Sequence, residues 1–201
     1  MFEPSLPTLI AQVTAAAAAA ATPYPITYVP DLPLSYHVTY SVITIVHLLL
    51  AITLLGALTH QAVALLWPAG RLAPAAGGVP PTPSLLHAYR AVRVNLYTNA
   101  VIALYLVTGL VGAFLYGPYR VSVLPFFYGH GLKLFGGVFE LKEHLVVIGV
   151  ALLPVYWLLW KKVPLGEQTR WRTAVTAILA GFVWYSFLVG HVLNNLKGFG
   201  T

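Results

Sequence analysis

Two glutamates and a histidine begin one of the most apolar stretches of the chain. Residues 139–162 read FELKEHLVVIGVALLPVYWLLWKK, which places Glu140, Glu143 and His144 within roughly one and a half helical turns. Glu140 and His144 are spaced i, i+4 and share a helix face, and Glu143 flanks that face. Ionisable groups are costly beside hydrocarbon, so these three side chains are candidate functional groups.

The two carboxylates allow several kinds of chemistry. A glutamate can hydrogen-bond an imidazole nitrogen and fix its tautomer. It can accept the proton of a quinol that is oxidised near the membrane surface. Glu140, Glu143 and His144 can also bind a metal ion together with His191 or His130. A structural role is the remaining alternative, because the helix macrodipole favours carboxylates in a first turn.

Three histidines fall at one depth of the predicted helices. At 1.5 Å per residue, His47, His144 and His191 lie about 7, 9 and 12 Å to the same side of their segments' midpoints. Helical bundles hold cofactors between facing helices, and two imidazoles are a common ligand pair for b-type haem. We therefore predict a haem site in which two of the three bind iron, while the third orients a propionate or a quinone.

The remaining histidines are less informative. His60 falls about 13 Å to the opposite side of the midpoint of the first segment. There it either binds a second haem or makes a hydrogen bond to a neighbouring helix. A second haem needs His87 as its other ligand, and His60 is turned about 140° from His47 on a straight helix. One haem is therefore expected, with a second left open. His37 and His130 are predicted to lie at the outer surface.

The composition of the chain indicates whether these residues lie in a soluble or a membrane protein. The chain has 201 residues, of which 59% are hydrophobic and 8% are charged. A soluble domain carries roughly 25% charged residues, so the sequence predicts an integral membrane protein. The absence of cysteine excludes disulfides, iron–sulfur clusters and c-type haem attachment. In such a chain the net charge of +6 bears on membrane orientation and does not indicate nucleic-acid binding.

Four apolar segments are long enough to cross a bilayer. The predicted spans are 37–66, 90–116, 140–160 and 173–193, separated by breaks at 68–84, 117–137 and 161–170. The predicted fold is thus all-α, an integral membrane four-helix bundle over residues 37–193, followed by a short tail at 194–201. The brevity of the last break predicts that the third and fourth helices are antiparallel neighbours.

Residues 1–36 form a segment of different composition. An alanine-rich run at 9–22 favours a helix, and a proline-rich run at 23–36 favours an extended strap. A signal peptide is the alternative for the first run, although the start MFEPS carries no basic residue. We expect an extended, partly helical strap outside the membrane that packs on a partner subunit.

Lysine and arginine are unevenly divided between the two sides of the predicted bundle. One side carries Arg71, Arg90, Arg93, Lys161, Lys162, Arg170 and Arg172, whereas the other carries Arg120, Lys133, Lys142 and Lys197. The positive-inside rule then places both termini on the non-cytoplasmic side of a membrane, which we take to be a prokaryotic cytoplasmic membrane.

Two glycines lie beside the predicted ligands. Gly149 follows His144 in the third segment, and Gly190 directly precedes His191 in the fourth. A small residue there lets a flat cofactor ring approach the helix, and it equally lets a neighbouring helix pack closely. The sequence leaves both readings open.

The arrangement resembles the small four-helix membrane cytochromes b, which anchor a redox partner to the quinone pool. The resemblance covers the architecture of residues 37–193 and rests on His47, His144 and His191 at matched depth, with His60 toward the other side. It implies b haem, contact with a quinone or quinol, and other subunits of a larger complex. The chain departs from the familiar two-haem pattern because it has a single well-placed histidine on the inner side.

The leading hypothesis is a haem-b-binding membrane subunit of a respiratory or photosynthetic electron-transfer complex, in which Glu140 or Glu143 handles protons. It passes electrons between a quinone pool and a redox partner, as a membrane subunit of an oxidoreductase complex. One alternative is a cofactor-free structural subunit. Another is a copper, zinc or iron protein with a glutamate and histidine site at the outer face. All three are surrounded by membrane lipid, and none binds nucleic acid.

Overall fold

The computed structural model describes residues 33–67, 84–85, 88–89 and 92–199, and these contain helices but no strand. The elements are α2 (Leu34–Leu66), α4 (Thr98–Pro118), the π-helix η1 (Tyr119–Val123), α5 (Leu124–Gly129), α6 (Lys133–Lys161) and α7 (Thr169–Leu196). Four of the helical segments have the length and composition to cross a membrane, which confirms the all-α membrane fold class. The predicted strap at 1–36, apart from its last four residues, and His87 lie outside the described residues.

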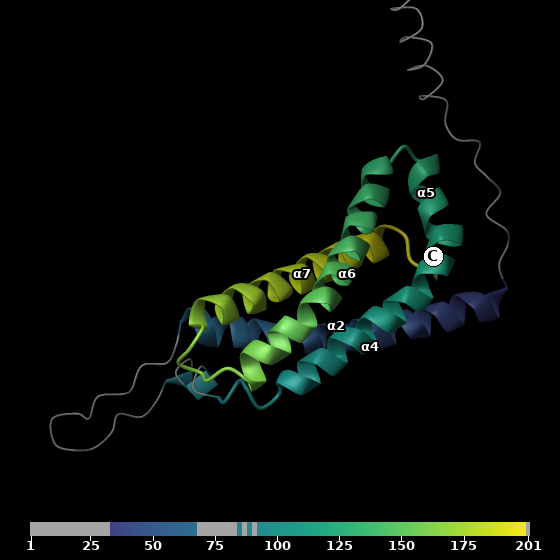
Figure 1. The fold of residues 1–201 in the computed structure, drawn as a ribbon. Coiled ribbons are helices and arrows are strands. Elements are labelled where there is room, and N and C mark those ends of the chain that lie inside the picture. Colours follow the sequence, from purple (N-terminus) through teal and green to yellow (C-terminus); the bar gives the residue numbers. More distant parts are fainter. Residues whose placement is uncertain (1–32, 68–83, 86–87, 90–91, 200–201) are drawn as a thin grey trace, which may run out of the picture.

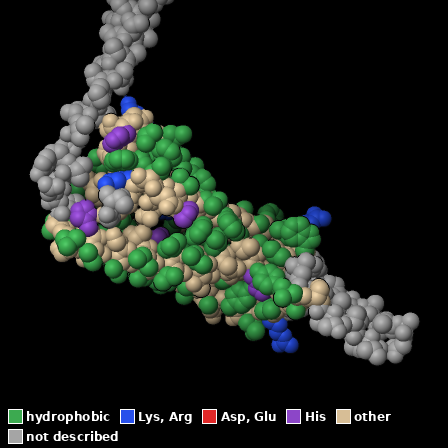
Figure 2. All heavy atoms as spheres, turned by 180° about the vertical axis from the view of Figure 1, so that it is seen from behind, with side chains coloured by type: hydrophobic (Ala, Val, Ile, Leu, Met, Phe, Trp, Pro, Cys, Tyr) green, Lys and Arg blue, Asp and Glu red, His purple; other side chains and the backbone are tan. Residues whose placement is uncertain are grey.

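The four long helices form a closed ring of contacts (Figure 1). α2 packs against α4 and α7, and α6 completes the ring by packing against the same two helices. The predicted antiparallel pairing of the last two helices, α6 and α7, is confirmed. Hydrophobic side chains cover much of the outer surface (Figure 2), as a bundle in contact with lipid requires.

The second span differs from its prediction at both ends. It begins at Thr98 instead of near residue 90, and helical structure continues through η1 and α5 to Gly129. The predicted break at 117–137 is therefore mostly helical. Pro118 lacks the N–H group that would bond a carbonyl of the preceding turn, and the π-helix begins at the next residue. α5 then packs against the start of α6, and Gly131 makes the turn between them at a φ of 73°.

The two ends of the bundle differ, and we name them by their contents. The hairpin end holds the start of α2, the α5–α6 hairpin and the end of α7, whereas the loop end holds the opposite ends of the four helices (Figure 1). At the loop end the amide of Gln61 is fully buried. Its Nε2 donates to the Val94 carbonyl (2.8 Å), and its Oε1 accepts a hydrogen bond from the Tyr156 hydroxyl. This amide ties α2, α6 and the segment before α4 together.

Arg172 of α7 closes the same end. Its side chain is 1% exposed, and its guanidinium lies 5.6 Å from the centre of the Trp160 ring. It donates to the carbonyls of Leu159 (2.9 Å), Val163 (3.1 Å), Pro164 (3.0 Å) and Leu165 (2.7 Å). Carbonyls at a helix C-terminus and in the turn beyond it lack intrahelical partners, so this arginine supplies the donors that the end of α6 needs.

We expect Arg172→Met to destabilise the protein by about 3 kcal/mol, because it leaves buried carbonyls without donors. For a chain of this size the melting temperature in detergent should fall by about 6–12 °C. Arg170→Met is the matched control, since Arg170 is exposed on the same helix. Equal melting of the two variants would show that the carbonyl contacts do not stabilise the bundle.

Gly149 of α6 is a point of close helix packing. A Cβ atom at this position would lie 2.6 Å from Cζ of Tyr105 on α4, well inside van der Waals contact. The Tyr105 hydroxyl also donates to the Val146 carbonyl of α6 at 3.4 Å. Of the two readings of this glycine, the structure therefore places a neighbouring helix against it.

Gly149→Ala should separate α4 from α6 and lower the melting temperature in detergent, because overpacking of a close contact costs about 1–3 kcal/mol. Gly137→Ala, in the same helix, should raise stability slightly, since a Cβ there meets no atom within 4 Å. The prediction fails if the two alanine variants melt at the same temperature.

Candidate functional site

A cavity of about 190 Å³ lies between the helices toward the hairpin end. Every membrane helix contributes to its wall, and η1 and the segment after α7 contribute as well. Most of the lining is apolar, and it includes Leu48, Leu54, Phe139, Val146, Val183 and Phe187. An apolar hollow with a few polar groups is the usual form of a cofactor or small-molecule site.

Within the described residues, four polar atoms around this cavity lack a hydrogen-bond partner. They are His47 Nδ1, Thr108 Oγ1, Tyr119 OH and Ser186 Oγ, each of them buried. All four residues line the cavity, and they come from α2, α4, η1 and α7 respectively. A buried polar group without a partner costs free energy, and hydrocarbon offers no replacement. Their convergence on one hollow is what a site for a partly polar ligand requires.

Two of the predicted histidine ligands, His47 and His191, line the cavity from neighbouring helices. The ring of His47 lies against α4, where a Cβ added to Gly112 would be 3.1 Å from its Cε1. The ring of His191 is parallel to Phe187 at 6.3 Å, and its Nε2 lies 3.2 Å from the amide nitrogen of Asn195. Both imidazoles thus line the cavity, although the His191 side chain is exposed and its Nε2 accepts a hydrogen bond from Asn195, whereas His47 is half-buried.

His47 and His191 lie at similar heights in the bundle. Two hydrogen bonds set the register of α7 against α2, from Trp184 Nε1 to Thr59 Oγ1 (2.9 Å) and from His37 Nδ1 to the Phe199 carbonyl. Counted along the helices, the first bond places His47 about 8 Å nearer the hairpin end than His191, and the second places it about 3 Å farther from that end, so the two heights agree to within about one and a half helical turns. The structure therefore brings together two members of the predicted layer.

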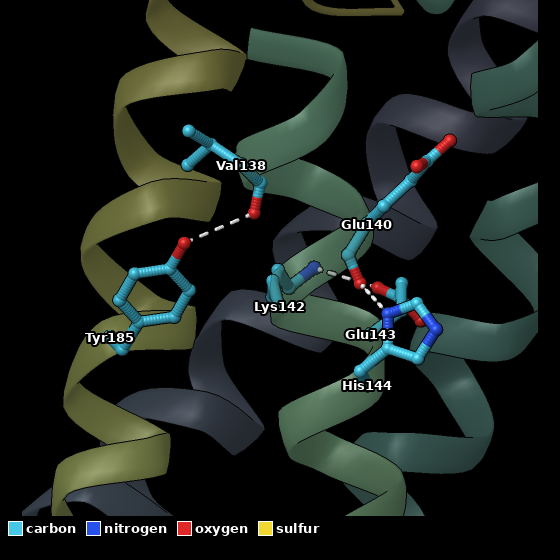
Figure 3. A network of polar contacts seen from close by, with 6 residues as sticks. All are labelled: Val138, Glu140, Lys142, Glu143, His144 and Tyr185. Carbon is cyan, nitrogen blue, oxygen red and sulfur yellow. Dashed lines mark hydrogen bonds and ion pairs between the residues drawn. The ribbon is translucent and has the colours of Figure 1, made fainter. Parts of the chain in front are cut away.

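His144, the third member of the predicted layer, lies elsewhere. Its side chain is exposed and does not line the cavity. Its Nδ1 hydrogen-bonds the backbone carbonyl of Glu140 at 2.7 Å, and Figure 3 shows the ring close against its own helix. The predicted contact between a glutamate and this imidazole thus involves the backbone of Glu140 rather than its carboxylate, which is also exposed.

Glu143 is the glutamate that reaches the cavity. It lines the wall beside Lys142, and the two side chains form an ion pair with Nζ and Oε1 3.3 Å apart (Figure 3). Of the two residues predicted to handle protons, Glu143 therefore has access to a ligand in the cavity. Among the described residues, no three His, Asp or Glu side chains lie close enough together to hold a metal ion.

His60 belongs to the loop end and has partners for both ring nitrogens. The Tyr97 hydroxyl donates to Nδ1, and Nε2 donates to the Tyr89 carbonyl at 2.6 Å. Burial, together with the neighbouring Tyr89, raises the pKa of Tyr97 to about 12, so the phenol stays a donor at neutral pH. This is the hydrogen-bonding alternative for His60. Its predicted partner in a second haem site, His87, is outside the described residues.

The hydroxyl residues of the cavity could not be singled out from sequence. Hydroxyls in membrane helices usually bond a carbonyl of their own helix, as Thr44, Thr53 and Ser122 do here at 2.7–2.9 Å. Thr108 and Ser186 look the same in the sequence, and they differ only because the space beside them is empty. No local sequence pattern shows which hydroxyls will lack a partner in the folded bundle.

Comparisons with known proteins identify no relative. No family model, no curated protein and no solved structure matches the chain.

Thr108→Val should stabilise the ligand-free protein by about 1 kcal/mol, because it replaces an unpartnered buried hydroxyl with a methyl group of similar size. Thr98→Val is the matched control, since the buried Thr98 hydroxyl donates to the Asn95 carbonyl at 3.2 Å. That variant should lose stability. Melting curves in detergent test the pair, and a loss of stability in both would mean that Thr108 has a partner.

Proposed function

We propose that the chain is a haem-b-binding subunit of a membrane electron-transfer complex, in which His47 and His191 would hold the iron. The observation that carries the proposal is the pair of imidazoles, which line one apolar cavity from neighbouring helices at similar heights. Neutral imidazole pairs are frequent ligands of b-type haem, and the chain has no cysteine for covalent attachment.

The side chains around the cavity have the chemistry that this cofactor requires. The buried Nδ1 of His47 has no partner, and Gly112 provides the space in which its ring can lie. Gly190 lines the cavity beside His191, and a Cβ there would meet no atom within 4 Å. When bound, a b haem supplies one-electron transfer. The walls of the cavity are largely apolar, and the polarity around a haem influences its reduction potential.

Glu143 is the residue we assign to proton handling beside the cavity. A quinol that passes electrons to a haem must also release protons, and a carboxylate at the cavity wall can accept one. Its Oε1 forms an ion pair with Lys142 Nζ at 3.3 Å. Exchange with a quinone pool is thus part of the proposed function, together with a redox partner on another subunit.

The exposed side chains of Glu140 and His144 support assembly with other subunits. Polar and ionisable groups within membrane helices normally pair with a partner, yet these two lie on the outside of the bundle. A neighbouring subunit would supply that partner in the complex. The distribution of lysine and arginine places both termini on the non-cytoplasmic side in this proposal, in a prokaryotic cytoplasmic membrane.

The first test is the reduced-minus-oxidised visible spectrum of the purified protein, with the haem content measured as the pyridine haemochrome. We expect a b-type spectrum and about one haem per chain, because one pair of histidines lines the cavity. His47→Ala and His191→Ala should each lose the haem or shift its spectrum strongly.

His144→Ala is the matched control, because it removes an exposed histidine of the same predicted layer. It should retain a full and unshifted spectrum. Loss of haem in this variant with retention in His47→Ala would reverse the assignment. A protein that contains no haem after expression with ample haem would instead favour a structural subunit.

A further inference from the structure

The cavity wall carries an excess of positive charge. Its charged lining residues are Lys142, Glu143 and Lys197, so two cations face one carboxylate. The Lys142 side chain is 13% exposed, and its ammonium group lies 4.8 Å above the Phe139 ring. Glu143 balances one of the two cations. In an apolar setting an uncompensated cation is costly, which favours a ligand that brings an anion.

Lys197 is held in place at the hairpin end of the cavity. It follows the last turn of α7, where its backbone N–H donates to the Leu193 carbonyl at 2.9 Å. Its ammonium group lies 5.7 Å from the centre of the Phe126 ring of α5. Within the described part of the chain, its ammonium group makes no ion pair with a carboxylate.

The segment after α7 fixes this position further. Phe199 lines the cavity two residues beyond Lys197, its carbonyl is bonded by His37 Nδ1, and its ring packs 5.8 Å from Tyr40. The C-terminal turn is thus fastened to the start of α2. This attachment fixes the backbone of the turn that carries Lys197 at the cavity wall.

We propose that Lys142 and Lys197 form a carboxylate-binding subsite of the cavity, which receives one propionate of the haem. This inference rests on the proposed function and adds to it the orientation of the cofactor. His47 and His191 hold the iron from α2 and α7, while the lysines of α6 and of the C-terminal turn select the edge that carries the carboxylates. Charge-assisted hydrogen bonds of this kind are the stronger class in proteins.

The test is a titration of the haem-free protein in detergent with haem and with haem dimethyl ester, in which both carboxylates are masked. The wild-type protein should bind haem at least about tenfold more tightly than the diester, the factor expected for one charge-assisted hydrogen bond. Lys142→Gln and Lys197→Gln should each weaken haem binding by about tenfold and leave diester binding unchanged.

Lys162→Gln is the matched control, because Lys162 is exposed at the loop end beside Trp157, and its removal changes the net charge equally. It should change neither affinity. Unchanged diester binding also shows that a lysine variant is folded.

Equal affinity of the wild-type protein for haem and diester would overturn the subsite while leaving the haem proposal intact. A variant that loses both ligands equally would assign that lysine a structural role. Failure of the wild-type protein to bind either ligand would overturn the haem proposal together with the subsite.

Discussion

Hydrocarbon supplies no hydrogen bonds, so every polar group inside this bundle depends on the protein itself for a partner. At the loop end the requirement is met. Arg172 saturates the carbonyls that follow α6, and Gln61 joins three segments of the chain. Both nitrogens of His60 are bonded as well. This end has the properties of a closed, stabilising core.

The hairpin end meets the same requirement only in part. Four buried polar atoms have no partner there, and all four belong to residues around one cavity. A bundle selected for stability alone would fill such a hollow with apolar side chains, since isosteric replacement of an unpartnered group is neutral or stabilising. The unmet hydrogen bonds and the unbalanced lysine are therefore the structural basis of the proposed ligand site.

Glycine determines how closely the helices approach at both levels of the bundle. Near the middle, Gly149 admits the Tyr105 ring, which joins α4 to α6. Closer to the hairpin end, Gly112 admits the ring of His47 from α2. The same property serves packing at one position and the placement of a candidate ligand at the other, which is why the two roles could not be separated from sequence.

Much of the architecture follows from the sequence alone, because the length and hydrophobicity of each segment are local properties that a bilayer selects. They predicted four helices, the pairing of α6 with α7 and the shared depth of His47 and His191. Which way a side chain points around its helix depends on the neighbours that the helix finds. Only the tertiary structure separated His144 from the cavity and brought Thr108 and Ser186 to its wall. The depth of a residue follows from its position along its own helix. The direction in which its side chain points depends on how that helix packs against the others.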